Sequence, residues 1–187
     1  MLIDLQTPEG EELLATGKTP WEVYPRPQLR RNSYVNLNGT WEFTVTAEDS
    51  LPDEYDHQIL VPFCPESQLS GLKIHPKDGA YLCYRRKITL PEGFRKDRVL
   101  LHIGAADQIA EIYVNQIRLA VHYGGYEAFC VDITDVLAEE NALVIRCVDD
   151  LRDKAFPYGK QTLKRGGMWY TPVSGIWQTV WLEPVAP

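Results

Sequence analysis

Membrane-spanning and strongly basic segments are both missing from this chain of 187 residues. A transmembrane helix needs about 20 consecutive apolar residues, and no run approaches that length. Lys and Arg number 19 against 26 Asp and Glu, so the net charge is −7. Proteins that bind nucleic acid or anionic membranes need a basic patch that neutralises phosphates. We therefore expect neither kind of partner.

Secretion and disulfide motifs are also missing. The segment Met1–Gly10 has neither the basic region nor the apolar core of a signal peptide. The sequence holds four cysteines and no Cys-x-x-Cys pair: Cys64, Cys83, Cys130 and Cys147. We expect a cytoplasmic protein whose reduced thiols serve as small apolar side chains.

Motifs for catalysis are lacking as well. The histidines show no metal-ligand spacing: His57, His75, His102 and His122. Ser174 precedes a glycine, but Pro172 stands where a nucleophile elbow requires glycine. Gly124-Gly125 is followed by a strand pattern, whereas a phosphate-binding loop leads into a helix. We expect no metal, no cofactor and no catalytic residue.

Helical periodicity is weak, and short alternating segments dominate. Only 11–15 suggests a helix, which Gly17 would end. The alternation predicts strands at 40–45, 57–61, 81–90, 98–103, 109–114, 118–123, 129–133 and 142–148. Asn115-Gln116 would join two of them in a hairpin, and the prolines within Trp21–Pro27 predict an extended segment. The pattern predicts one all-β domain, a sandwich or a barrel.

The final strand pattern, Ser174–Glu183, carries two tryptophans on one face. Alternation places the side chains on two faces: Ile176, Gln178, Val180 and Leu182 on one, Trp177, Thr179, Trp181 and Glu183 on the other. Indoles are rarely left on a solvated face, so we expect both faces to be covered. The cover would come from this chain or from whatever follows Pro187. Trp177 and Trp181 are therefore expected in the core or between domains.

Several motifs in one order suggest a known family. They are Leu37-Asn38-Gly39-Thr40-Trp41-Glu42-Phe43, Val61-Pro62-Phe63-Cys64-Pro65-Glu66-Ser67, Tyr84-Arg85-Arg86, Gly104-Ala105-Ala106-Asp107, Tyr113-Val114-Asn115, the run from His122 to Phe129, Asp132-Ile133-Thr134, Gly159-Lys160-Gln161 and the Ser174–Glu183 strand. The chain resembles the N-terminal, non-catalytic sugar-binding domain of glycoside hydrolase family 2. The resemblance implies a jelly-roll β-sandwich, galactose-binding-domain-like and mostly antiparallel. Gln116, Ala128 and Cys83 depart from the family pattern, and Gln116 in place of a hairpin glycine predicts a turn that is either longer or strained.

The resemblance also implies how the domains are arranged and which of them carries the catalytic residues. Residues 1–27 would be an extended N-terminal segment packed on a jelly-roll domain at 28–187, and the catalytic barrel would lie elsewhere in the parent chain. Retaining glycosidases use two carboxylates, and in this family both are glutamates on the barrel. The acids at 139–140 and 149–153 are therefore expected to be solvated turns. Asp107 and Asp132 are expected to hydrogen-bond loop backbone.

Two loops, Ser70–Tyr81 and Lys154–Tyr170, are expected at one end of the sandwich, where the family's loops help to shape the substrate entrance. Their candidate residues are Lys73, His75, Asp78, Tyr158, Lys160, Gln161, Trp169 and Tyr170. Aromatic faces beside polar groups suit sugar rings. For Trp169 and Tyr170, packing in a core or interface is an equal alternative.

We expect this chain to support a β-galactosidase-like parent and to hydrolyse nothing alone. Its expected partners are the catalytic barrel and a linking sandwich domain of the same parent, and homo-oligomers and a carbohydrate ligand are left open. An autonomous carbohydrate-binding module is the alternative, and a self-sufficient enzyme would need two close carboxylates in a cleft.

Overall fold

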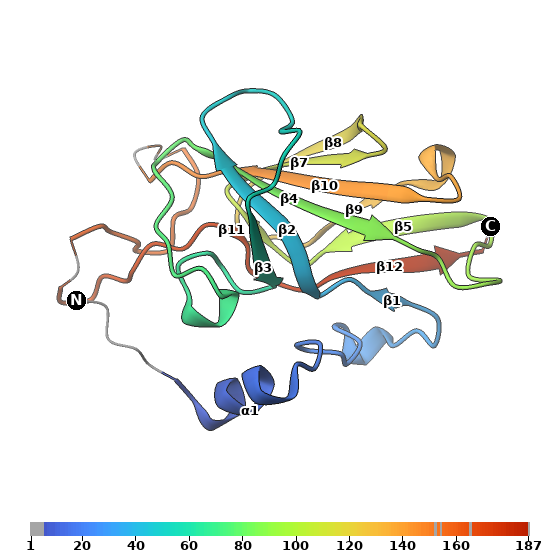
Figure 1. Ribbon diagram of the computed structural model, residues 1–187, viewed down its shortest axis with the longest axis horizontal. Coiled ribbons are helices and arrows are strands. Elements are labelled where there is room, and N and C mark those ends of the chain that lie inside the picture. Colours follow the sequence, from blue (N-terminus) through green and yellow to red (C-terminus); the bar gives the residue numbers. More distant parts are fainter. Residues whose placement is uncertain (1–5, 152, 154, 165, 187) are drawn as a thin grey trace.

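The computed structural model describes residues 6–186 except 152, 154 and 165. It is a sandwich of two antiparallel β-sheets (Figure 1), which confirms the expected all-β jelly roll. The first sheet has the order β1 (Val35–Asn36), β12 (Val180–Val185), β5 (Arg98–Ile103), β9 (Phe129–Asp132). The second has the order β3 (His57–Val61), β2 (Gly39–Thr46), β4 (Tyr81–Ile88), β10 (Asn141–Val148), β7 (Ile109–Val114), β8 (Ile117–Tyr123). A short pair, β11 (Gly175–Ile176) and β6 (Ala106–Asp107), completes the fold.

Helices are few and short in the described part of the chain. Helix α1 covers Pro8–Thr16, and single 3₁₀ turns cover Pro27–Leu29, Gln68–Ser70 and Thr134–Val136. The Thr7 hydroxyl accepts a hydrogen bond from the Gly10 amide at 3.1 Å and starts α1, and Gly17 ends it with a φ of 62°. The expected helix at 11–15 is therefore present but longer. None of the described helices has the length and apolarity needed to span a bilayer.

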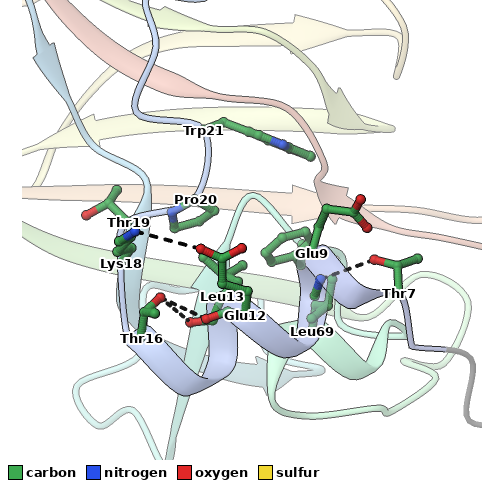
Figure 2. A pocket seen from close by; sticks show the side chains of 12 residues that line it. Thr7, Glu9, Glu12, Leu13, Thr16, Lys18, Thr19, Pro20, Trp21 and Leu69 are labelled. Carbon is green, nitrogen blue, oxygen red and sulfur yellow. Dashed lines mark hydrogen bonds and ion pairs between the residues drawn. The ribbon is translucent and has the colours of Figure 1, made fainter.

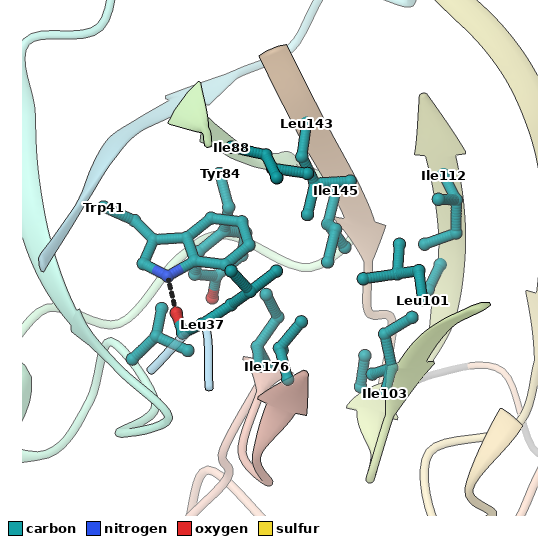
Figure 3. Packing of buried hydrophobic residues seen from close by; sticks show 14 of the residues in the cluster. Leu37, Trp41, Tyr84, Ile88, Leu101, Ile103, Ile112, Leu143, Ile145 and Ile176 are labelled. Atoms are coloured by element: carbon teal, nitrogen blue, oxygen red, sulfur yellow. Dashed lines mark hydrogen bonds between the residues drawn. The ribbon is translucent and has the colours of Figure 1, made fainter. Parts of the chain in front are cut away.

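The core lies between the two sheets and takes alternate side chains from most strands (Figure 3). Trp41 on β2 and Ile145 on β10 meet Leu101 and Ile103 on β5 within this one cluster. The Trp41 indole donates to the Leu37 carbonyl at 2.7 Å, so its polar atom is satisfied inside the core. Since the core is filled by the chain's own side chains, ligand sites lie at the ends and outer faces of the sandwich.

The last strand departs from its sequence prediction, because Trp177–Thr179 separate β11 from β12. The chain changes partners there: β11 pairs with β6, whereas β12 pairs with β5 and β1. The break turns Gln178 outward, although simple alternation placed it on the apolar face. The expected burial of both faces does hold for β12, where both Trp181 and Leu182 are buried.

The N-terminal segment also differs from its prediction. Proline restricts its own backbone and that of the residue before it, and Trp21 is followed by a glutamate rather than a proline. Trp21 adopts a φ of 48°, in the left-handed region, so Trp21–Pro27 is not uniformly extended. The segment nevertheless runs along the outer side of the first sheet, beneath β1 and β12 in Figure 1.

The turn between β7 and β8 supplies a stability test. Asn115 and Gln116 have φ values of 51° and 67°, as the hairpin prediction required. Because glycine adopts this conformation without a Cβ clash, Gln116→Gly is expected to raise the free energy of unfolding by about 1 kcal/mol. Urea unfolding of both proteins measures the difference. Gln116→Ala, which keeps the Cβ, is the control and should gain nothing.

Candidate functional site

The two loops expected to act together do meet at one end of the sandwich. His75 and Asp78 from the first loop line one small cavity with Leu163 from the second and with Asp149, which follows β10. Its volume is about 20 Å³. A space of this size admits roughly one water molecule and excludes a sugar ring. Any contribution of these loops to a sugar site must therefore come from their outer surfaces.

Gln161 anchors the second loop from the inside. Its Nε2 donates to Asp107 Oδ2 at 3.3 Å and to the Tyr126 hydroxyl at 3.4 Å, and its Oε1 accepts from the Val173 amide at 2.5 Å. The side chain is only 6% exposed. Gln161 was expected at the substrate entrance, but burial makes it a structural anchor instead.

The tip of the same loop is exposed and largely apolar. We call this surface the loop tip, and its members are Leu163, Met168, Trp169 and Tyr170. Its base is closed by backbone hydrogen bonds of 3.0 Å, from the Tyr170 amide to the Lys160 carbonyl and from the Thr162 amide to the Tyr170 carbonyl. Trp169 and Tyr170 are thus not core residues of this domain. They are held outward by an anchored loop.

The other expected entrance residues are more dispersed. Lys73, His75 and Lys160 are exposed, whereas Asp78 and Tyr158 are partly buried. Only His75 and Asp78 share the small cavity between the loops.

Three partly or fully buried acids lie beneath the loops. Burial raises the pKa of Asp107 to about 6, although the hydrogen bond from Gln161 acts to lower this pKa. Burial and the neighbouring carboxylates, Asp107 first among them, raise the pKa of Asp149 to about 7. Burial also raises the pKa of Glu66, which accepts hydrogen bonds from the Ser174 hydroxyl at 2.6 Å and the Ser174 amide at 3.2 Å. Perturbed acids often mark active sites, but the cavity that Glu66 and Asp149 line holds only about 20 Å³, too little for a sugar ring.

The two turn acids behave differently. Asp132 accepts a hydrogen bond from the Thr134 amide at 3.0 Å, which is the contact with loop backbone that the sequence predicted. Asp107 was expected to do the same, but its hydrogen bond comes from the Gln161 side chain, and its Oδ1 has no partner among the described residues. The reason is its depth, since β6 is covered by the second loop.

A buried glutamate joins the end of the chain to its beginning. Glu183, 1% exposed, accepts from the Tyr24 hydroxyl and Arg26 Nη2 at 2.5 Å each and from Arg31 Nε at 2.8 Å. The Trp181 indole donates to it at 2.7 Å. Burial would raise the pKa of Glu183, but these hydrogen bonds outweigh burial and lower it. We call this group the Glu183 cluster; it was not identified from the sequence.

The Glu183 cluster supplies the cover that Trp181 required. Trp181 stacks on His102 with ring centroids 4.8 Å apart and lies under Arg26, whose Cζ is 5.2 Å from the ring centroid. Both neighbours belong to this chain, so no further domain is needed to bury Trp181. Trp177 remains partly exposed.

Two open grooves adjoin the N-terminal segment, and Trp21 borders both. One, of about 400 Å³, separates α1 from the body; Figure 2 shows Leu13 and Leu69 on its walls and Trp21 at its rim. The other, of about 600 Å³, lies against the link between β11 and β12. We call it the aromatic groove, and its members include Trp21, Tyr24, Arg26, Trp177, Gln178 and Trp181. These are the larger spaces that the described residues leave open.

Among the described residues, no three His, Cys, Asp or Glu side chains are grouped so that they could hold a metal ion. The four thiols are free, and burial raises the pKa of Cys64 to about 12 and of Cys83 to about 11.

Comparisons with known proteins agree with this architecture. No established protein-family profile matches the chain. It is 28% identical to a β-glucuronidase of Paenibacillus borealis over 150 residues, covering 74% of this chain and 24% of that protein. It is 37% identical to a β-glucuronidase of Chlorocebus aethiops over 132 residues, covering 62% and 20%. A β-galactosidase of Thermoanaerobacter pseudethanolicus is 28% identical over 54% of this chain and 13% of its own length.

The crystal structure of Ruminococcus gnavus β-glucuronidase has the same fold in one part. It superposes with a TM-score of 0.64 at 20% identity, over 86% of this chain and 30% of that one. The resemblance to family 2 glycoside hydrolases is confirmed. The chain spans about a quarter of the length of the first curated relatives, so the similarity concerns one part of those proteins.

Proposed function

We propose that this chain is the non-catalytic, N-terminal sandwich domain of a larger β-glycosidase. In this role it supports a catalytic barrel and contributes the loop tip to the substrate entrance. The short coverage of the relatives supports the proposal, because most of a β-glucuronidase or β-galactosidase has no counterpart in these residues. The reaction of the whole protein would be hydrolysis of a β-glucuronide or a β-galactoside.

The observation that carries the proposal is the anchored loop tip. Its apolar side chains project outward although Gln161 fixes the loop at its base. Exposed apolar patches rimmed by polar residues commonly form interfaces with other domains or ligands. A rigid base holding an exposed Trp169-Tyr170 pair suits a surface that packs against a neighbouring domain and borders its substrate.

The test compares the chain with the whole protein encoded by its reading frame. The chain alone should not hydrolyse chromogenic β-glucuronides or β-galactosides, and the whole protein should hydrolyse one of them. In the whole protein, Trp169→Ala with Tyr170→Ala is expected to lower kcat/KM by about tenfold or more, because substrate-bordering contacts are lost.

The matched control is Ile117→Ala. Ile117 is an exposed apolar residue at the β7–β8 turn, at the opposite end of the sandwich from the loop tip (Figure 1). It should leave kcat/KM unchanged. Turnover by the chain alone, or equal effects of the two sets of variants, would contradict the proposal.

A further inference from the structure

The aromatic groove has the dimensions of a ligand site. Its volume of about 600 Å³ lies within the range of roughly 300–1,000 Å³ that small-molecule pockets occupy. One wall is the N-terminal segment, and the other is the link between β11 and β12. This arrangement is unrelated to the loop tip.

The N-terminal wall is fixed in place by the Glu183 cluster. Tyr24 and Arg26 both donate to the buried Glu183 carboxylate at 2.5 Å, and Asn36 Nδ2 donates to the Trp21 carbonyl at 2.9 Å. These contacts lie within the chain itself, so its own residues hold this wall and little ordering is required on binding. Preformed sites lose less free energy to ordering than flexible ones.

Two indoles present partly open faces to the groove. Trp21 is 57% exposed and has a left-handed backbone, a conformation that disfavours any residue with a Cβ. The Trp21 ring packs against Phe63, with centroids 5.4 Å apart, and the rest of the indole stays open. Trp177 is oriented by a hydrogen bond from its Nε1 to the Gly125 carbonyl at 2.8 Å. Indole faces stack on the CH groups of a pyranose ring.

The groove also has a cationic side chain on its wall. Arg26 lines the groove and its side chain is 40% exposed. Its Nη2 binds Glu183, and its Nε has no hydrogen-bond partner among the described residues. In a chain of net charge −7, this guanidinium favours an anionic group.

The groove also offers a hydrogen-bond partner for the hydroxyl groups of a sugar. Gln178, which the strand break turns outward, lines the groove with an exposed amide. An amide both donates and accepts hydrogen bonds, as sugar hydroxyls require.

We propose that the aromatic groove binds a hexuronic acid residue, with its pyranose ring against Trp21 and Trp177 and its carboxylate facing Arg26. The proposal goes beyond the proposed function, because it needs neither a catalytic barrel nor the loop tip. It assigns the chain a binding site of its own for acidic sugars.

The test follows the indole N–H signals of the ¹⁵N-labelled chain by NMR during titration. The probes are D-glucuronate, D-glucose, which has the ring without the carboxylate, and acetate, which has the carboxylate without the ring. D-Glucuronate is expected to shift the Trp21 and Trp177 signals with a millimolar dissociation constant. Binding of either control should be about tenfold weaker. The Trp41 and Trp169 signals should not move.

Two variants and a control locate the site. Trp21→Gly, which suits the left-handed backbone, should weaken D-glucuronate binding about tenfold, and Gln178→Ala should weaken it several-fold. Ile117→Ala, which removes an exposed apolar side chain from the β7–β8 turn, should change it less than about twofold. The remaining indole signals report whether each variant is folded.

Three results would overturn the proposal. They are no shift at about 100 mM D-glucuronate, equal binding of D-glucose, and shifts that Ile117→Ala removes but Trp21→Gly does not. Each is distinct from a failure of the proposed function, which is measured by turnover of the whole protein.

Discussion

Replacing Glu183 with alanine is expected to lower the free energy of unfolding by about 3–5 kcal/mol. The substitution leaves Arg26 and Arg31 without their carboxylate and the Trp181 indole without an acceptor in a buried place. The Tyr24 hydroxyl and the Trp181 indole then stay buried without an acceptor, at a cost of about 1–3 kcal/mol each, whereas the arginine side chains are 40% and 55% exposed and stay hydrated. For a domain of this size the loss corresponds to a fall in Tm of about 10 °C.

Urea unfolding and limited proteolysis measure the two consequences. The N-terminal segment should become cleavable between α1 and β1, because Tyr24 and Arg26 lose their common acceptor. Glu139→Ala, at an exposed acid, is the control and should change stability by less than about 0.5 kcal/mol. A loss below about 1 kcal/mol for Glu183→Ala would show that the cluster does not hold the segment.

Raising the pH from about 5 to about 7.5 is expected to lower the free energy of unfolding by about 3 kcal/mol. Asp107 and Asp149 have folded pKa values near 6 and 7, above the ordinary value of 3.8. A carboxyl group with a raised folded pKa binds its proton more tightly in the folded chain. Its contribution is complete below the unfolded pKa and is lost as the pH rises through the folded pKa. The window is therefore about pH 4 to pH 7.

Other carboxylates limit stability on the acid side. Hydrogen bonds lower the pKa of Asp132, and they also lower that of Glu183, where they overcome the effect of burial, so these acids lose stabilising contacts as the pH falls below about 4. Stability should therefore peak near pH 5.

Urea unfolding across this range tests the pH prediction. The double variant Asp107→Asn with Asp149→Asn should flatten the profile between pH 5 and 7.5, because the two groups can no longer titrate. Asp135→Asn, at an exposed acid, should leave it unchanged. A wild-type profile that rises with pH would contradict the assignment.

Local patterns were sufficient to predict most strands. The limits expected for 57–61, 98–103 and 109–114 coincide with β3, β5 and β7. Each of these segments alternates one buried face with one less buried face, and alternation is what a sequence displays directly. Helix α1 was underestimated because its start depends on a single hydroxyl, that of Thr7.

Contacts between distant residues were harder to foresee. Glu183 and Tyr24 lie 159 positions apart, and no local pattern connects them. Gln161 looked like a surface residue because glutamine usually is one, but Asp107 and the Val173 amide bind it inside the fold. The break at Trp177–Thr179 arises because Gly104 and Ala105 bond this link from another segment. Trp169 and Tyr170 were placed on the right loop, and their orientation came only from the structure.

The position of β12 has a consequence for biosynthesis. This strand lies between β1 and β5 in its sheet, yet it is the last of the described strands in chain order. Until the ribosome releases it, β1 has no neighbour and the apolar edge of β5 stays open. Nascent chains that lack β12 should therefore depend on chaperones and should form aggregates when translation stops early.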